Sequence, residues 1–170
     1  MNDIKLQTER LYISPLSIEE NRLLAEGDTV CMAKYDVDFK NETTKKQFLA
    51  VQRNQYEKML TDSKIFFWHS AWMLALKENG TIIGSGGFKG TPDANGIVEF
   101  HFDIFLAHEG NGYFHETIEC LSPWLLKQKG VLSITTKTLK IDSVSIIVLQ
   151  KNGFKLYKEN GNILIWRLNR

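Results

Sequence analysis

Apolar and polar residues alternate over several short stretches of this chain, which is the pattern of half-buried β-strands. Two pairs of these stretches are separated by Asn79-Gly80 and Asn160-Gly161. Asn-Gly between apolar runs favours a hairpin closed by a type I′ turn, so the sequence predicts two hairpins within a larger set of strands. The expected strands are 8–15, 71–77, 81–86, 97–106, 131–138, 154–158 and 163–168.

Two helices are expected in the first half of the chain. Ser17-Ile18-Glu19-Glu20 fits a capping box and predicts a short helix that ends near Ala25. The stretch 27–41 is ambiguous, whereas 41–60 is long, charged and free of Gly and Pro, which predicts a second helix. The inner face of that helix is expected to carry Phe48, Val51, Gln52, Tyr56 and Met59.

Two more helices are expected in the second half. One spans 113–128 and should kink before Pro123, because proline lacks the amide donor and clashes with the preceding turn. The other starts at Asp142 or Ser143 and ends at Gln150. This order of elements predicts an α/β (α+β) fold in a single domain, residues 1–170, with a mixed, mostly antiparallel, twisted sheet of six to seven strands flanked by about four helices.

The composition is that of an ordinary globular domain, because the 170 residues are 43% hydrophobic and 24% charged, with a formal net charge of +1. This balance gives no electrostatic basis for binding nucleic acid or an anionic membrane surface. No apolar run approaches the length of a membrane span, and the N-terminus does not fit a signal peptide. Cys31 and Cys120 lack metal or redox spacing, so we expect free thiols in a cytoplasmic protein.

A glycine loop at 107–113 joins the strand 97–106 to the helix that follows. Gly110 and Gly112 let the backbone approach a ligand closely, and amide N–H groups at a helix N-terminus attract phosphate. A simpler interpretation is that both glycines only permit a tight turn. A dinucleotide fingerprint is excluded, because His115 stands where its third glycine is required.

The order of the elements and the residues within them resemble the GCN5-related N-acetyltransferases, in particular the branch similar to ribosomal-protein-alanine acetyltransferases. The resemblance covers essentially the whole chain, and the set of motifs in this order is more specific than any one of them. The stretches that carry it are Thr8-Glu9-Arg10-Leu11, 83–90, Val98-Glu99-Phe100, Gly110-Asn111-Gly112-Tyr113 with Glu116, and 145–154.

The resemblance implies transfer of an acetyl group from acetyl-CoA to a primary amine of a protein N-terminus or small molecule, by direct attack in a ternary complex. The implied partners are acetyl-CoA and this amine acceptor, and relatives are monomers or homodimers. No motif identifies the acceptor. The residues expected to bind acetyl-CoA are Phe102, Ile104, Glu109, Gly110, Asn111, Gly112, Tyr113, Asp142 and Ser145.

Three ionisable residues are candidates for the general base, because alternation places Glu99, His101 and Asp103 on one face of a strand. The resemblance favours Glu99, whereas chemistry favours His101, because the ordinary histidine pKa suits proton transfer at neutral pH. The three ionisable residues on this face would also be explained if the face is simply solvated, or if the residues pair with one another. The resemblance gives Ser145 the role of hydroxyl donor to the departing thiolate, and a plain helix-surface serine is the alternative.

The glycine loop departs from the family pattern at two positions. Relatives carry Gln or Arg at the position of Ala107, and they often carry Arg at the position of Glu109. A carboxylate in place of arginine costs about 1 kcal/mol per phosphate charge at about 8 Å in a water-like dielectric, so we expect weakened but not abolished binding. Asp142 and Leu149 replace the asparagine and the tyrosine general acid of many relatives. The alternative function is therefore a catalytically weak or inactive module that binds a ligand or partner. A third possibility is transfer from a different acyl-CoA.

Two further groups of residues have ordinary interpretations beside functional ones. Phe66, Trp68 and Trp72 would border the acceptor site in this family, or they are core aromatics. His115-Glu116 resembles the start of a zinc-protease motif, but Glu119 stands where the second histidine is required. We therefore expect no metal site.

Overall fold

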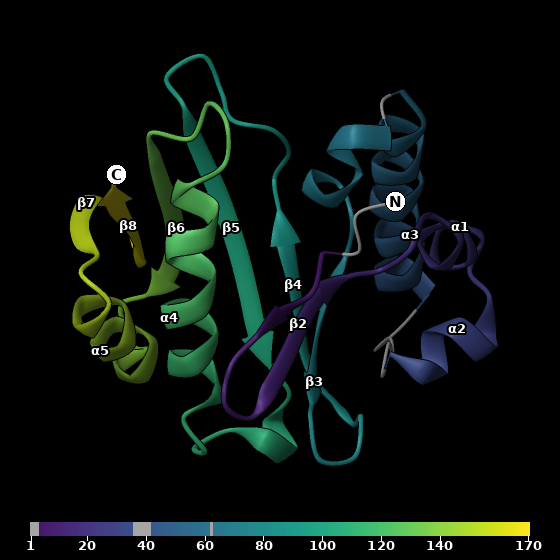
Figure 1. The fold of residues 1–170 in the computed structure, drawn as a ribbon, viewed down its shortest axis with the longest axis horizontal. Helices are drawn as coiled ribbons and strands as arrows, with labels where there is room; N and C mark the ends of the chain where they lie inside the picture. Colours follow the sequence, from purple (N-terminus) through teal and green to yellow (C-terminus); the bar gives the residue numbers. More distant parts are fainter. Residues whose placement is uncertain (1–3, 36–41, 62) are drawn as a thin grey trace.

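Eight strands form a single sheet in the computed structural model, which describes residues 4–35, 42–61 and 63–170 (Figure 1). The strands lie in the order β1-β2-β3-β4-β5-β6-β8-β7, and neighbours are antiparallel except β5 and β6, which are parallel. The predicted mixed sheet is confirmed, with one strand more than the upper expectation. The strands are β1 Leu6–Gln7, β2 Leu11–Pro15, β3 Trp72–Leu76, β4 Ile82–Phe88, β5 Ile97–Ile104, β6 Ser133–Leu139, β7 Lys155–Asn160 and β8 Ile163–Asn169.

The additional strand is β1, whose two residues are too few for alternation to reveal. The strand predicted from Thr8 starts instead at Leu11, because residues 8–10 form a tight turn. In this turn the Thr8 amide donates to the Leu11 carbonyl at 3.0 Å, and the Leu11 amide donates to Thr8 Oγ1 at 2.8 Å. The turn directs the side chain of Arg10 toward the second half of the chain, where it contacts Glu116 and the Asn111 carbonyl.

Five α-helices accompany the sheet in the described residues, rather than about four. The additional helix, α2, lies in the stretch that was ambiguous in the sequence. Ser17 and Glu20 form the predicted capping box, and Asp142 caps α5, whereas the predicted helix start Asn41 lies outside the described residues. The helices are α1 Ile18–Glu26, α2 Thr29–Lys34, α3 Glu42–Thr61, α4 Tyr113–Leu126 and α5 Ser143–Lys151, with 3₁₀ helices η1 Ser63–Trp68 and η2 Leu106–His108.

The predicted hairpin turns were wrong in position or length. In the first hairpin the loop is 77–80 rather than two residues, because the Leu76 amide donates to the Thr81 carbonyl at 2.9 Å and so closes the loop one residue beyond Gly80. Gly80 has a φ of 75° and its amide donates to the Leu76 carbonyl at 2.8 Å. In the second, Asn160 still pairs with Ile163, so the turn residues are 161–162. Both pairs of strands are nevertheless adjacent and antiparallel, as the apolar pattern predicted.

Two helices also differ from the prediction. Val51 was expected on the inner face of α3 but is 56% exposed, because this helix packs mainly against α1 and η1 and buries a narrower stripe. Met59, on the same predicted face, is buried. Helix α4 passes through Pro123 and ends at Leu126, two residues earlier than expected.

Helices cover both faces of the sheet (Figure 1). Met73 of β3 packs with Leu24 of α1 and Met32 of α2 in one apolar cluster. The next residue, Leu74, belongs to the main core with Ile118 of α4. Because successive strand residues point to opposite faces, α1 and α2 cover one face and α4 the other.

Two tryptophans, Trp68 at the end of η1 and Trp72 at the start of β3, belong to the core. Trp72 is fully buried and its ring lies 5.3 Å from Phe88 and 5.4 Å from Trp124, while Trp68 lies 5.4 Å from Phe88. These edge-to-face contacts are typical of packed aromatic interiors. The core interpretation of Trp68 and Trp72 is therefore confirmed.

The sheet opens between its two parallel strands. Register pairs between β5 and β6 end at Glu99, which pairs with Thr135, although β5 continues to Ile104. The second half of β5 therefore keeps its partner β4 on one side and separates from β6 on the other. The opening lies next to the start of α4 and places a cavity there.

Candidate active site

A cavity of about 720 Å³ lies between the end of β5, the glycine loop and the first turns of α4 and α5. It brings together residues from four elements that are up to 46 positions apart in the chain. Eight of the nine residues expected to bind acetyl-CoA line it, and Asn111 is the exception. The eight residues are Phe102, Ile104, Glu109, Gly110, Gly112, Tyr113, Asp142 and Ser145.

The glycine loop is shaped by its two glycines and by the side chain between them. Gly110 and Gly112 adopt φ values of 77° and 79°, which side-chain-bearing residues rarely take. The Asn111 amide group donates to the carbonyl oxygens of His108 and Glu109, each at 3.1 Å. Asn111 therefore holds the loop from within, although its own side chain does not line the cavity.

Free amide donors gather at this loop. Within the described part of the chain, no acceptor takes a hydrogen bond from the amide N–H groups of residues 110–115. Gly112 is the N-cap of α4 and has no side chain to satisfy the first turn of this helix. Unpaired N–H groups combined with the positive end of the helix dipole form a site suited to a phosphate group.

Helix α5 forms the opposite wall. The carboxylate of Asp142 accepts a hydrogen bond from the Ser145 amide at 3.0 Å and so fixes the first turn of α5 beside the cavity. The Ser145 residue lines the cavity, as do the apolar residues Val144 and Val148 on the same helix. This wall combines one hydroxyl group with apolar surface.

Glu99 is engaged by two lysines. Its carboxylate lies 2.5 Å from Lys89 Nζ and 2.9 Å from Lys137 Nζ. Burial alone would raise the pKa of Glu99, but hydrogen bonds from the two lysines outweigh it and lower the pKa. Glu99 therefore stays charged at neutral pH and is a weaker base than an unpaired carboxylate.

His101 follows on the same face of β5, with part of its side chain reaching solvent. The protein atoms around the ring still displace enough water to lower the pKa of His101 from its ordinary value of 6.5, although the nearby Asp103 opposes this shift. The imidazole is therefore neutral at pH 7 and able to accept a proton. Neither His101 nor Glu99 lines the cavity, but Asp103 does, so the predicted face meets the cavity through its last residue.

The structure adds cavity residues that the sequence analysis did not assign to the site. Phe114 lines the cavity with its ring partly packed against the core, and the cavity stays open beside it. His115 also lines it, with Nδ1 2.9 Å from the Asn152 side-chain nitrogen. Both residues lie in the first turn of α4. Their place directly after the glycine loop is the sequence signal that could have assigned them to the site. Leu149, by contrast, is fully buried in the core.

Two other kinds of feature are missing from residues 4–35, 42–61 and 63–170, a metal centre and a membrane-spanning helix. No group of three or more His, Cys, Asp or Glu residues there could hold a metal ion. Among the helices of that part of the chain, none combines the length and apolar character that crossing a membrane requires.

Comparison with known proteins assigns the chain to a family through a family model, and a relative and solved structures are similar to it. A family model described as an acetyltransferase (GNAT) domain matches residues 10–155. The uncharacterized N-acetyltransferase YjdG of Bacillus subtilis (strain 168) is 32% identical over 96 residues, which cover 56% of this chain and 57% of that protein. The match therefore spans little more than half the length of this relative.

Solved structures share the fold at low sequence identity. An acetyltransferase from Agrobacterium tumefaciens strain C58 is 20% identical with a TM-score of 0.64, covering 100% of this chain and 96% of its own. RimL, a ribosomal L7/L12 alpha-N-protein acetyltransferase solved with coenzyme A, is 10% identical with a TM-score of 0.64, covering 98% of both chains. At these identities the likeness concerns the fold alone.

Proposed function

Because this chain belongs to the GNAT acetyltransferase family, we propose that it transfers the acetyl group of acetyl-CoA to a primary amine. The acceptor would be the amine of a protein N-terminus or of a small molecule, attacking directly in a ternary complex. The observation that carries this proposal is the cavity in which the free amides of the glycine loop meet the end of β5, where β5 has separated from β6. RimL, which shares the fold, was solved with coenzyme A.

The cavity suits the two chemical parts of acetyl-CoA. Amide groups at the N-terminus of α4 are donors for the diphosphate, and they do not depend on the side chain of Glu109. Phe102, Ile104 and Val148 supply an apolar wall for the less polar pantetheine arm. A volume of about 720 Å³ is within the range of small-molecule and cofactor sites.

The reaction requires one proton to move. The amine nitrogen attacks the thioester carbon, the C–S bond breaks, and the proton lost by the amine reaches the departing thiolate. Neutral His101 is the proposed base, directly or through water, because the lysines beside Glu99 weaken that carboxylate as a proton acceptor. The hydroxyl of Ser145, which lines the cavity, is the proposed donor to the thiolate.

His101→Ala is expected to lower kcat at least tenfold, because a general base contributes roughly 10²–10⁴-fold to the rate. Glu99→Gln should lower kcat less than threefold, because the proposal gives Glu99 no role in proton transfer. The pKa of His101 lies below 6.5, so the base is active at neutral pH and is lost by protonation at lower pH. Protonation of the acceptor lowers kcat/KM in both proteins. The wild-type profile should steepen further below pH 6.5, and the His101→Ala profile should not. Unchanged turnover in both variants would remove the assignment of the base to this face.

Binding and turnover separate the proposed enzyme from the alternative module. We expect calorimetry to detect acetyl-CoA and CoA binding with the wild-type chain. We also expect a thiol reagent to detect CoA release with at least one member of an amine panel of peptides, polyamines and amino acids. Binding without release from any amine would favour a module that has lost catalysis. If neither acetyl-CoA nor CoA binds at millimolar concentration, the proposal is wrong.

A further inference from the structure

An open groove of about 750 Å³ lies on the other side of the glycine loop, between the turn at residues 8–10 and helix α4. Gly112 and His115 line both this groove and the cavity described above. The loop and the first turn of α4 are therefore a thin partition, with the proposed ligand on one side and the groove on the other. Whatever fixes the groove side of the partition also fixes its cavity side.

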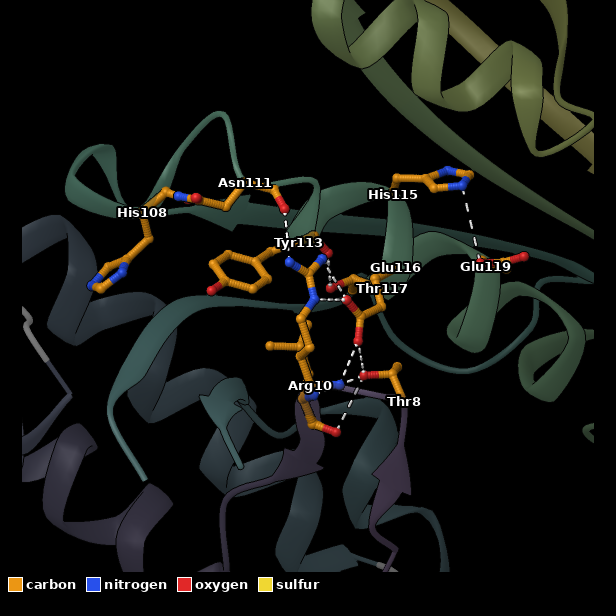
Figure 2. A network of polar contacts seen from close by, with 10 residues as sticks. Thr8, Arg10, His108, Asn111, Tyr113, His115, Glu116, Thr117 and Glu119 are labelled. Atoms are coloured by element: carbon orange, nitrogen blue, oxygen red, sulfur yellow. Dashed lines mark hydrogen bonds and ion pairs between the residues drawn. The ribbon is translucent and has the colours of Figure 1, made fainter. Parts of the chain in front are cut away.

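Arg10 holds that partition from the groove (Figure 2). Its Nε and Nη2 atoms each lie 2.7 Å from Oε2 of Glu116, in the first turn of α4. Its Nη1 atom donates to the carbonyl oxygen of Asn111 at 3.0 Å, and the guanidinium lies 4.5 Å from the centre of the Tyr113 ring. A single planar side chain thus contacts the glycine loop at Asn111 and the first turn of α4 at Tyr113 and Glu116.

Glu116 is in turn fully engaged by the turn that carries Arg10. Its Oε1 atom accepts hydrogen bonds from the Arg10 amide at 2.8 Å and from the Thr8 hydroxyl (Figure 2). Burial alone would raise the pKa of Glu116, but the hydrogen bonds from Thr8 and Arg10 outweigh it and lower the pKa. The carboxylate is therefore charged at neutral pH. Since it neutralises Arg10, the pair acts through geometry rather than through net charge.

The contact with Asn111 sets the direction of a donor on the cavity side. The chain has no cis peptide bond in its described part, and in a trans peptide the N–H group points opposite to the preceding carbonyl. Arg10 draws the Asn111 carbonyl toward the groove, so the Gly112 amide must point away from Arg10. Gly112 lines the cavity, where this amide can donate.

We propose that Arg10, braced by Glu116, is a positioning residue that orients the glycine-loop amides for the diphosphate of acetyl-CoA. This proposal rests on the proposed function, because it assigns the diphosphate to that loop. Asn111 and Glu116 lie 101 and 106 positions after Arg10 in the sequence, so local turn propensity cannot replace these contacts. Without the contacts of Arg10, the loop would remain but its amide donors would be poorly aligned.

The test compares two acetyl donors that differ in the diphosphate. Arg10→Lys keeps the positive charge but cannot contact Glu116 and the Asn111 carbonyl through one planar group. We expect the KM for acetyl-CoA and the calorimetric Kd for CoA to rise at least tenfold. With S-acetylpantetheine, which lacks the diphosphate, kcat/KM should stay within twofold of wild type. Glu116→Gln should give the same donor-selective defect with a smaller magnitude.

Arg22→Lys is the matched control, because Arg22 also spans two carboxylates, those of Glu19 and Glu26, on helix α1. It should leave both donors unchanged, and thermal melts should show that all variants are folded. Equal losses with both donors would assign Arg10 a merely structural role and overturn the proposal. Wild-type affinity for CoA in both Arg10→Lys and Glu116→Gln would also overturn it. If the wild-type chain itself fails to bind CoA, the proposed function fails together with this inference.

Discussion

Gly86→Ala is expected to lower the free energy of unfolding by at least about 3 kcal/mol, the upper range for overpacking a core. A Cβ atom at Gly86 would lie 2.2 Å from the His101 carbonyl oxygen and 2.4 Å from Cγ of Phe102. Neither neighbour can move cheaply, because one is backbone and the other is the start of a ring that packs against Phe88. Strands β4 and β5 must therefore separate at a registered pair in the middle of the sheet.

The same substitution should also damage the cavity, because Phe102 lines it. Chemical denaturation followed by circular dichroism measures the stability, and a melting temperature lower by roughly 6–12 °C is expected for a chain of this size. Ser85→Ala, one residue earlier on β4, is the control and should change stability by less than about 1 kcal/mol. Equal stability of the two variants would contradict the close approach of the strands at Gly86.

Gly110→Ala is expected to reduce the affinity for CoA at least tenfold. Gly110 has a φ of 77°, and a Cβ atom there meets nothing within 4 Å, so the protein itself has room for it. The cost to folding is the left-handed backbone alone, about 1–2 kcal/mol. The larger effect is on binding, because the methyl group would stand where the backbone must approach the diphosphate.

Gly80→Ala separates these two effects. Gly80 has a φ of 75° and equally open surroundings, but it lies in the β3–β4 loop and does not line the cavity. Both variants should lose similar stability in thermal melts, and only Gly110→Ala should lose affinity in calorimetric titration with CoA. Wild-type affinity in Gly110→Ala would contradict the assignment of the phosphate to this loop.

Local patterns in the sequence predicted the features that depend on neighbouring residues. The alternation around Val98 and Phe100 identified β5 and its buried face, and the pattern of Ser17 and Glu20 identified the start of α1. Most of the expected acetyl-CoA residues line one cavity because they flank a single loop and two helix starts. Their roles in binding and catalysis remain predictions.

Features that depend on distant contacts could not be predicted in this way. Of the lysines that engage Glu99, Lys89 directly follows β4 and Lys137 lies in β6, and nothing in the local pattern around Glu99 indicates them. The ion pair between Arg10 and Glu116 also joins residues far apart in the sequence. Both residues belong to stretches that resemble the family, but the resemblance did not indicate that they form a pair. The position of a hairpin turn depends on the register of its strands. In the second hairpin Asn160 pairs with Ile163, and this moves the turn by one residue from the predicted Asn160-Gly161 to 161–162.

The placement of the four tryptophans has a practical consequence. Trp68, Trp72 and Trp166 are buried in the core, Trp124 packs against it, and none of them lines the cavity. Their intrinsic fluorescence should therefore report loss of the core during unfolding and stay nearly silent when the cavity fills. An emission spectrum that changes with denaturant but not with added CoA gives a label-free way to distinguish a damaged interior from an empty site in every variant described above.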